Sequence, residues 1–398
     1  MAVVNGASRL FRQGSGTVAG GRVALRIAPD LLTHLTEGRQ VSLVTGTNGK
    51  TTTTALLAAA LRGGHRFVTS NDTGSNMPAG FVAAVASGER FGPIVLETDE
   101  AYLSSAIETM NPALVVLLNL SRDQLDRSSE VRLLAERWRN ALGSFQGTVI
   151  ANADDPLVAF AAATAKNCRW VSGGSSWQLD AVGCPVCDGL LSHGVKEWSC
   201  ATCGFARPVT EVEVQQDAAE LVLEINGVPT HSAFLLPGAF NRSNAAMAVT
   251  AAIANGVDLE SALLGVSLVG EVAGRFATVR VASRDVTMML AKNPAGWTAL
   301  LDLVDSGEGP LILSINARVA DGFDPSWLWD VEFERLRGRS VVVTGDRRFD
   351  LAVRLHYGEV AHDVCADPVE AVRVSREGAL SFIGNYTAFA EFSNKASV

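Results

Sequence analysis

LVTGTNGKTTTTA, residues 43–55, starts as an apolar strand, turns through two glycines and continues into an alanine-rich helical stretch. Gly46 and Gly49 let the backbone curl so that successive N–H groups face one anion, beside the positive end of the new helix. Lys50 reaches the β- and γ-phosphates of a nucleotide from this position, and the Thr51 hydroxyl suits Mg²⁺. The segment predicts a phosphate loop for ATP, formed by Gly46, Thr47, Asn48, Gly49, Lys50, Thr51 and Thr52.

The spacing of this loop is Gly-x-x-Gly-Lys-Thr, which is two residues shorter between the glycines than the common phosphate-loop pattern. Val44 stands where that pattern has its first glycine. The alternative is a glycine turn that only joins a strand to a helix. The strand, the lysine and the hydroxyls occur in the order that a nucleotide site requires, which favours the nucleotide interpretation.

The length and composition indicate a large protein in which each domain can bury a hydrophobic core. At 398 residues and 47% hydrophobic content, two or three domains are expected. The longest strongly apolar run, Ala113–Leu118, is too short to cross a bilayer, and no signal-peptide stretch opens the chain, so we expect a cytoplasmic protein without a membrane span. A net charge of −9 argues against nucleic acid as the main partner.

The first forty residues are more basic than the rest. Arg9, Arg12, Arg22 and Arg26 lie among apolar residues, so a weak basic surface for peripheral contact with a membrane-borne substrate is one interpretation. The other interpretation is a segment that packs on the main domain and leaves its arginines in solvent.

Four of the six cysteines form the pattern Cys-x2-Cys-x12-Cys-x2-Cys. Each pair can present two thiolates from a tight turn to one tetrahedral ion, which predicts a structural Zn²⁺ site in a ribbon at about residues 175–208. The alternatives are two disulfides or reduced cysteines without a ligand. The predicted ligands are Cys184, Cys187, Cys200 and Cys203, whereas Cys168 and Cys365 are typical of core positions.

Apolar runs and helical stretches alternate along the chain, which predicts an α/β fold with mostly parallel sheets and helices on their faces. We expect an N-terminal segment (1–40), a central ATP-binding domain (41–278) with the ribbon inserted, and a Rossmann-like C-terminal domain (279–398). Asn119, Asn152 and Asp154 stand at predicted strand ends and should line the nucleotide crevice. Asn226-Gly227 signals a hairpin, with strands expected at Glu220–Ile225 and His231–Leu236.

Further segments in the same order resemble the Mur ligase superfamily. They are LETDE (96–100), NADDP (152–156), LPGAFNRSNAA (236–246) and Gly274-Arg275-Phe276. The resemblance implies that Asn241 and Asn244 serve the nucleotide, that Arg275 reaches the phosphates, and that Glu97 holds Mg²⁺ together with Thr51.

Other segments resemble the MurT family within that superfamily. Gln124 in DQLD (123–126) replaces the histidine of typical Mur ligases, which puts a second Mg²⁺ in question, and the four-cysteine ribbon is a MurT feature. The C-terminal segments that match are AKNPAG (291–296), ADGFDPSWLWD (320–330), TGDRRFDLAVRL (344–355) and NYTA (385–388).

The MurT resemblance implies an activity and a partner. ATP would convert the D-glutamate α-carboxyl of the lipid II stem peptide to an acyl phosphate, and ammonia would turn it into D-isoglutamine at the inner face of the membrane. A GatD-like glutamine amidotransferase subunit would supply the ammonia within a heterodimer. Asp350 would complete the catalytic triad of that partner, whereas the alternative for Asp350 is a helix N-cap.

Two other functions stay open at this point. One is a Mur-type ligase that joins an amino acid to a carboxylate, as in peptidoglycan precursor or folylpolyglutamate synthesis. The other is a non-catalytic module that binds ATP and recruits a partner through its ribbon. Lys50, Thr51, Glu97 and Arg275 are all present, which disfavours the non-catalytic module.

Overall fold

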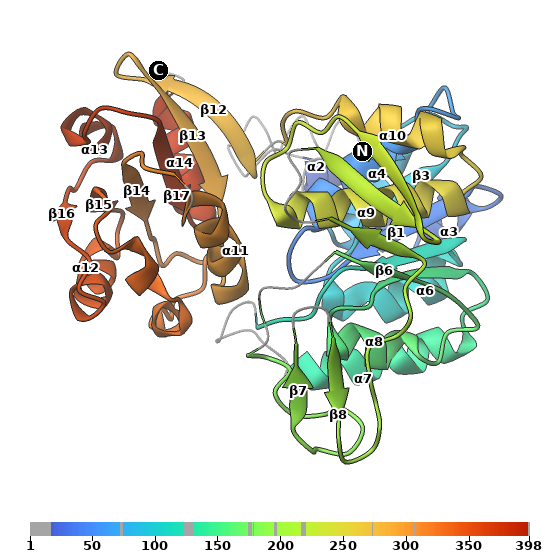
Figure 1. The fold of residues 1–398 in the computed structure, drawn as a ribbon. Coiled ribbons are helices and arrows are strands. Elements are labelled where there is room, and N and C mark those ends of the chain that lie inside the picture. Colours follow the sequence, from blue (N-terminus) through green and yellow to red (C-terminus); the bar gives the residue numbers. More distant parts are fainter. Residues whose placement is uncertain are drawn as a thin grey trace. The chain divides into compact units, whose positions relative to one another are not determined.

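A computed structural model of the chain describes residues 17–71, 75–122, 131–173, 177, 179–194, 197–215, 220–272, 274–305 and 307–396. They form two compact units, each with its own sheet (Figure 1). The first unit contains the described residues up to Leu120 and from Val131 to Gly270. The second contains Ser121, Arg122 and the described residues from Glu271 onward.

The first unit is built on a nine-stranded sheet in the order β11-β10-β9-β6-β5-β4-β1-β3-β2. The strands from β2 to β9 in this order pair in parallel, and β10 and β11 are antiparallel at the edge. The strands are β1 Val41–Thr45, β2 Thr69–Ser70, β3 Ile94–Glu97, β4 Leu114–Leu117, β5 Thr148–Asn152, β6 Asn167–Ser172, β9 Val212–Val214, β10 Leu221–Ile225 and β11 Val228–Ser232. Every residue of β1, β3 and β4 is buried, as expected for parallel strands covered on both faces.

Two groups of helices cover the two faces of this sheet. Val41 and Leu43 of β1 lie in the core with α5, α6, α7 and α8, whereas Ser42 accepts a hydrogen bond from Asn255 at the end of α9. Because successive strand residues point to opposite faces, α9 and its neighbours α4 and α10 cover the other face. The helices are α2 Thr17–Ile27, α3 Leu31–Thr36, α4 Lys50–Leu61, α5 Pro78–Ser87, η1 Glu100–Tyr102, α6 Leu103–Met110, α7 Val131–Ser144, α8 Pro156–Ala162, α9 Ala239–Ala254 and α10 Leu259–Ser267.

The N-terminal helix α2 packs on α5. A Cβ atom at Gly21 would lie 2.0 Å from Ala79 O, so the two helices approach to backbone contact. Arg22 and Arg26 are exposed, as expected for a packed segment with solvated arginines, and Arg9 and Arg12 lie outside the described residues. Within the described ranges, no helix has the length and apolar character needed to cross a membrane.

The edge hairpin differs from the sequence prediction in one strand. Val228 pairs with Ile225 directly after the Asn226-Gly227 turn, where both turn residues have positive φ (50° and 82°). The predicted strand at His231–Leu236 is therefore wrong: β11 begins three residues earlier, because a two-residue turn of this kind sets the register at once.

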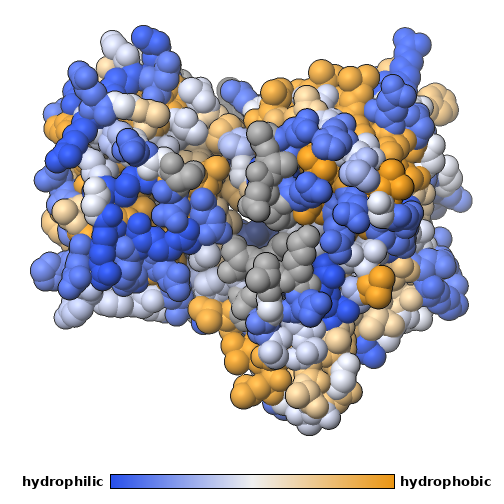
Figure 2. Space-filling model, in the orientation of Figure 1, coloured by the Kyte–Doolittle hydropathy of each residue, from blue (hydrophilic) through white to orange (hydrophobic). Residues whose placement is uncertain are grey.

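The ribbon interrupts the first unit between β6 and β9. Its two short antiparallel strands are β7 Leu191–His193 and β8 Trp198–Cys200. Apolar side chains remain exposed on it, among them Val182, Val186 and Leu190 (Figure 2). A hairpin this small cannot bury a core of its own, so a metal is the expected source of its stability.

The second unit has a six-stranded sheet in the order β12-β13-β17-β14-β15-β16, in which only the β12–β13 pair is antiparallel. The strands are β12 Phe276–Val281, β13 Arg284–Leu290, β14 Leu311–Ser314, β15 Val341–Thr344, β16 His362–Val364 and β17 Leu380–Gly384. The helices are α11 Pro294–Asp305, η2 Ser326–Asp330, η3 Phe333–Leu336, α12 Arg348–Tyr357, α13 Pro368–Val374 and α14 Tyr386–Ala396. Two α/β units with mainly parallel sheets confirm the predicted fold class.

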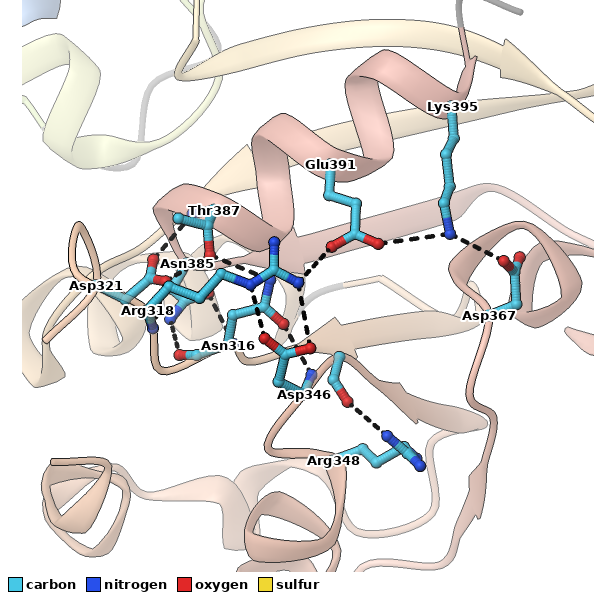
Figure 3. Close-up of polar contacts among 11 residues, drawn as sticks. Asn316, Arg318, Asp321, Asp346, Arg348, Asp367, Asn385, Thr387, Glu391 and Lys395 are labelled. Atoms are coloured by element: carbon cyan, nitrogen blue, oxygen red, sulfur yellow. Dashed lines mark hydrogen bonds and ion pairs between the residues drawn. The ribbon is translucent and has the colours of Figure 1, made fainter. Parts of the chain in front are cut away.

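Two buried asparagines join neighbouring strand ends in the second unit (Figure 3). Asn316 follows β14 and Asn385 follows β17. The Asn316 N–H donates to Asn385 Oδ1 at 3.0 Å, and Asn385 Nδ2 donates to Asn316 O at 2.6 Å. Asn316 Oδ1 also accepts the N–H of Asp346, which follows β15, at 2.8 Å. The carboxyl ends of three strands are thereby tied together.

We expect Asn385→Ala to lower the free energy of unfolding by about 2–4 kcal/mol, because it removes two buried hydrogen bonds and leaves their backbone partners unpaired. Denaturant unfolding of the purified chain measures this change. Asn394→Ala is the control, since Asn394 is exposed on α14, and it should change the stability by less than about 0.5 kcal/mol. Equal stability losses for the two variants would contradict the role given to Asn385.

Candidate functional site

The loop between β1 and α4 requires its two glycines. Gly46 and Gly49 have φ values of 142° and 87°. A Cβ atom at Gly46 would lie 2.8 Å from Leu118 Cβ, and one at Gly49 would lie 2.5 Å from Asn244 Oδ1. The loop then leads into the N-terminus of the twelve-residue helix α4. A tightly curled backbone that ends at a helix N-terminus fits the phosphates of a nucleotide.

Asn119, which follows β4, holds the shape of this loop. Its backbone O accepts the Thr47 N–H at 3.0 Å. Its side chain accepts the Asn48 N–H at 2.8 Å and donates to Asn48 O at 3.0 Å. The loop is therefore fixed by protein contacts, and a nucleotide need not order it.

Lys50 is only 5% exposed and is paired inside the unit. Its Nζ lies 3.0 Å from Glu100 Oε2 and donates to Gly46 O at 2.6 Å. Sequence reasoning missed Glu100 as the partner of the lysine, although it ends the LETDE segment that marks Glu97. The pairing compensates for the burial of the positive charge.

Thr51 and Glu97 meet as the sequence predicts for a magnesium site. The Thr51 hydroxyl donates to Glu97 Oε2 at 2.8 Å. Asn71, a further residue that the sequence did not single out, accepts the Glu97 N–H at 2.7 Å and donates to Glu97 O at 2.9 Å. A hydroxyl and a carboxylate are hard oxygen ligands of the kind that Mg²⁺ prefers, so the donor set fits this ion.

The other residues that the sequence predicts for nucleotide binding belong to different units of the chain. Asn241 and Asn244 are buried in the first two turns of α9, which packs on α4, and Asn244 lies beside Gly49. Thr52 is buried in the first turn of α4. Arg275 precedes β12 in the second unit, so its contact with the phosphates stays a prediction. Gln124 lies outside the described residues.

The four ribbon cysteines converge on one point. Their Sγ atoms all lie within 4.8 Å of one another. The Cys184–Cys203 and Cys187–Cys200 sulfur distances are 3.6 and 3.5 Å. Four sulfurs bound to one tetrahedral Zn²⁺ are expected to lie roughly 3.8 Å apart, so the cluster fits this ion. The backbone N–H of Cys203 lowers the pKa of the Cys200 thiol, because it donates a hydrogen bond that stabilises the thiolate.

Asp350 lies in the first turn of α12 and is about half exposed. The helix begins at Arg348 with Arg347 at the N-cap position, so the alternative in which Asp350 caps the helix is wrong. Among the described residues, the only one that donates a hydrogen bond to the Asp350 carboxylate is Arg347, whose Nη2 lies 2.9 Å from Oδ1. A half-exposed carboxylate of this kind is available to a group outside the chain.

Two families match the chain. Residues 44–180 match the Mur ligase middle domain, and residues 290–389 match the MurT ligase C-terminal domain. The chain is 31% identical over 377 residues to the MurT subunit of a glutamine-hydrolysing lipid II isoglutaminyl synthase from Streptococcus pneumoniae, with 87% of this chain and 83% of the relative covered. It is 28% identical to the corresponding MurT subunit from Staphylococcus aureus, with 94% and 91% covered.

Among solved structures, a pseudomurein peptide ligase type C from Methanothermus fervidus has the same fold. The TM-score is 0.69 at 19% sequence identity, with 90% of this chain and 79% of that chain covered. This likeness supports the Mur ligase fold.

We expect Lys50→Ala to reduce ATP turnover by at least about 100-fold, because the loop loses the charge that would face the phosphates. The variant should also lose about 3 kcal/mol of stability, since the Glu100 carboxylate, only 11% exposed, is left unpaired. The double variant Lys50→Ala/Glu100→Gln should recover most of the stability and none of the turnover. ATP turnover in Lys50→Ala that matches the unaltered protein would rule out this nucleotide site.

We expect elemental analysis to find one zinc per chain. Cys184→Ser should lower the melting temperature by several degrees, whereas turnover at saturating substrate should change little, because the metal stabilises the ribbon and does not take part in the chemistry. Cys365→Ser is the control, since Cys365 lies outside the cluster and should leave the zinc content unchanged. Purified protein without zinc and with four reactive thiols would refute the metal site.

Proposed function

This chain belongs to the MurT family, and we propose that it is the ligase subunit of a lipid II isoglutaminyl synthase. Its reaction is the ATP-dependent amidation of the D-glutamate α-carboxyl in the lipid II stem peptide to D-isoglutamine. The match to MurT subunits over most of both chains supports this proposal. The match at residues 290–389 disfavours a Mur-type ligase that adds an amino acid.

The chemistry starts with an unreactive carboxylate. A carboxylate oxygen attacks the γ-phosphorus of ATP and gives an acyl phosphate and ADP. Ammonia then attacks the acyl carbon, and phosphate leaves with the bonding electrons. Both steps crowd negative charge at one place, so positive charge must be concentrated there.

The residues of the chain divide this work. The backbone between Gly46 and Thr51 and the α4 N-terminus bind the phosphates, and Lys50 and Arg275 supply positive charge. Thr51 and Glu97 would hold Mg²⁺, which neutralises phosphate charge when bound. Asn241 and Asn244 serve the nucleotide from α9. Lys50 already has Glu100 as a partner, so a phosphate must compete for it.

Ammonia is scarce at neutral pH, because the ammonium ion dominates there, so a second subunit must release it beside the ligase site. We assign this task to a GatD-like glutamine amidotransferase in a heterodimer. The observation that carries the assignment is the half-exposed Asp350 carboxylate, whose described contacts leave Oδ2 without a partner. In the complex it would orient the partner's catalytic histidine and stabilise its imidazolium form.

The substrate sets the place of action. Lipid II is membrane-borne, so we propose that the complex works at the inner face of the membrane through peripheral contact. The basic N-terminal segment is one candidate for that contact, since Arg22 and Arg26 of α2 are exposed.

We expect Asp350→Asn to reduce glutamine-dependent amidation by about three to four orders of magnitude with the partner present, because the charge that stabilises the imidazolium is lost. A high concentration of ammonium salt should restore amidation, since it supplies the nucleophile directly. Both nitrogen sources are measured on the same purified complex.

Glu370→Gln is a matched control. Glu370 lies in the first turn of α13 and pairs with Arg373 three residues later, as Asp350 lies in α12 and pairs with Arg347 three residues earlier. It should leave both nitrogen sources in use. Normal use of glutamine by Asp350→Asn would refute the triad role, and failure with ammonium as well would place Asp350 in the ligase reaction.

A further inference from the structure

Two polar contacts join the ribbon to one turn of the first unit, residues 152–155. Arg132 on α7 also binds the ribbon, at Asp188 and at the Pro185 carbonyl, away from this turn. The Trp198 indole N–H donates to Ala153 O at 3.0 Å, and Trp198 is only 4% exposed. Arg207 Nε donates to Asp154 Oδ1 at 2.7 Å, and the two side chains are 13% and 7% exposed. Both contacts are largely shielded from water, so each links the position of the ribbon to the position of the turn.

Both donors are connected to the hairpin that carries the cluster of cysteines. Trp198 begins β8, which ends at the ligand Cys200. The Arg207 N–H donates to Trp198 O at 3.0 Å, and the Cys200 N–H donates to Phe205 O at 2.7 Å. Phe205 also packs its ring on Trp198, with the ring centres 4.9 Å apart. The metal-binding hairpin therefore sets where Trp198 and Arg207 point.

The same turn, residues 152–155, also binds the segment that follows β4. Asn152 Nδ2 donates to Leu118 O at 2.9 Å, and the Leu120 N–H donates to Asp155 Oδ2 at 2.8 Å. The residue between these two is Asn119, which binds the backbone of Thr47 and Asn48 in the phosphate loop. Contacts within one unit thus run without a break from the ribbon to the loop.

We propose that the ribbon supports the phosphate loop, with Trp198 and Arg207 as positioning residues, so that zinc binding and nucleotide binding strengthen each other. The turn 152–155 is the element through which they act. The proposal rests on the nucleotide site of the proposed function. It gives the metal a role in nucleotide affinity in addition to its role in the stability of the ribbon.

The turn also has contacts that do not involve the ribbon. The Ala153 N–H donates to Val171 O at 2.9 Å, and the Ser172 hydroxyl donates to Asp154 Oδ2 at 3.0 Å. If these were sufficient, the ribbon would be an independent module, and loss of its contacts would leave the loop unchanged. The two possibilities differ in the affinity for nucleotide, which can be measured without turnover.

The first experiment measures Mg²⁺-ADP binding by calorimetry on zinc-loaded Trp198→Phe and Arg207→Met proteins. Trp198→Phe keeps an aromatic ring and removes the indole N–H, and Arg207→Met keeps the aliphatic stem and removes the charge. Each should raise the dissociation constant by roughly threefold to thirtyfold, the range of couplings carried by contacts of this kind. Turnover at saturating ATP should be preserved, because neither residue lies in the loop.

Arg169→Met is the matched control. Arg169 lies on β6 of the same unit and pairs with Glu211 at 2.9 Å, away from the turn. Its affinity for Mg²⁺-ADP should equal that of the unaltered protein. If Arg207→Met fails to keep its zinc, Trp198→Phe decides the question, since it leaves the arginine in place.

The second experiment uses the reciprocity of linkage. Saturating Mg²⁺-ADP should raise the affinity for zinc of the unaltered protein, measured at equilibrium by competition with a chromophoric zinc chelator, and this increase should be smaller in Trp198→Phe. Unchanged ADP affinity in zinc-loaded Trp198→Phe, or a zinc affinity that does not respond to ADP, overturns the proposal. Normal nucleotide binding by Lys50→Ala would instead overturn the nucleotide site itself, so the two failures are distinguishable.

Discussion

The hydrogen bonds of Asn119 to the loop between β1 and α4 are the interaction on which the proposed nucleotide site of the first unit depends. A loop that must present several N–H groups to one anion is costly to order, because its glycines have the greatest conformational freedom to lose. Asn119 binds the backbone of Thr47 and Asn48 from the end of a neighbouring strand. The loop therefore loses its conformational entropy when the unit folds, before any ligand binds. Nucleotide binding then needs little rearrangement of the loop.

The side chains of this site, like the loop, are held by contacts within the protein. Lys50 is buried beside Glu100, and Thr51 beside Glu97, so each polar group has a partner before any ligand arrives. A buried lysine without a partner would destabilise the unit, whereas a paired one is tolerated. In the proposed function, a nucleotide and its Mg²⁺ would therefore have to replace these carboxylate contacts by phosphate contacts of comparable strength.

The second unit uses the carboxyl edge of its sheet differently. Asn316 and Asn385 satisfy each other, and Asn316 also accepts the N–H of Asp346 (Figure 3). Ligands commonly bind at the carboxyl edge of a parallel sheet. At this edge the side-chain amides of Asn316 and Asn385 form their hydrogen bonds with other groups of the protein. These hydrogen bonds fix the backbone at Asp346. The helix α12 begins two residues later and carries Asp350 in its first turn.

Local patterns in the sequence were sufficient for the α/β class, the contact between Thr51 and Glu97 and the four-cysteine cluster, because residues close in the chain carry each signal or a family motif marks it. The nucleotide-binding role of the loop between β1 and α4 stays a prediction. The tertiary structure alone decided which distant residues support them. Glu100 reaches Lys50, Asn71 holds Glu97, and the ribbon reaches the turn 152–155, since parallel strands far apart in sequence end at one edge of the sheet. Such pairings depend on the order of the strands in the sheet, and the hydrophobic periodicity of the sequence does not predict that order.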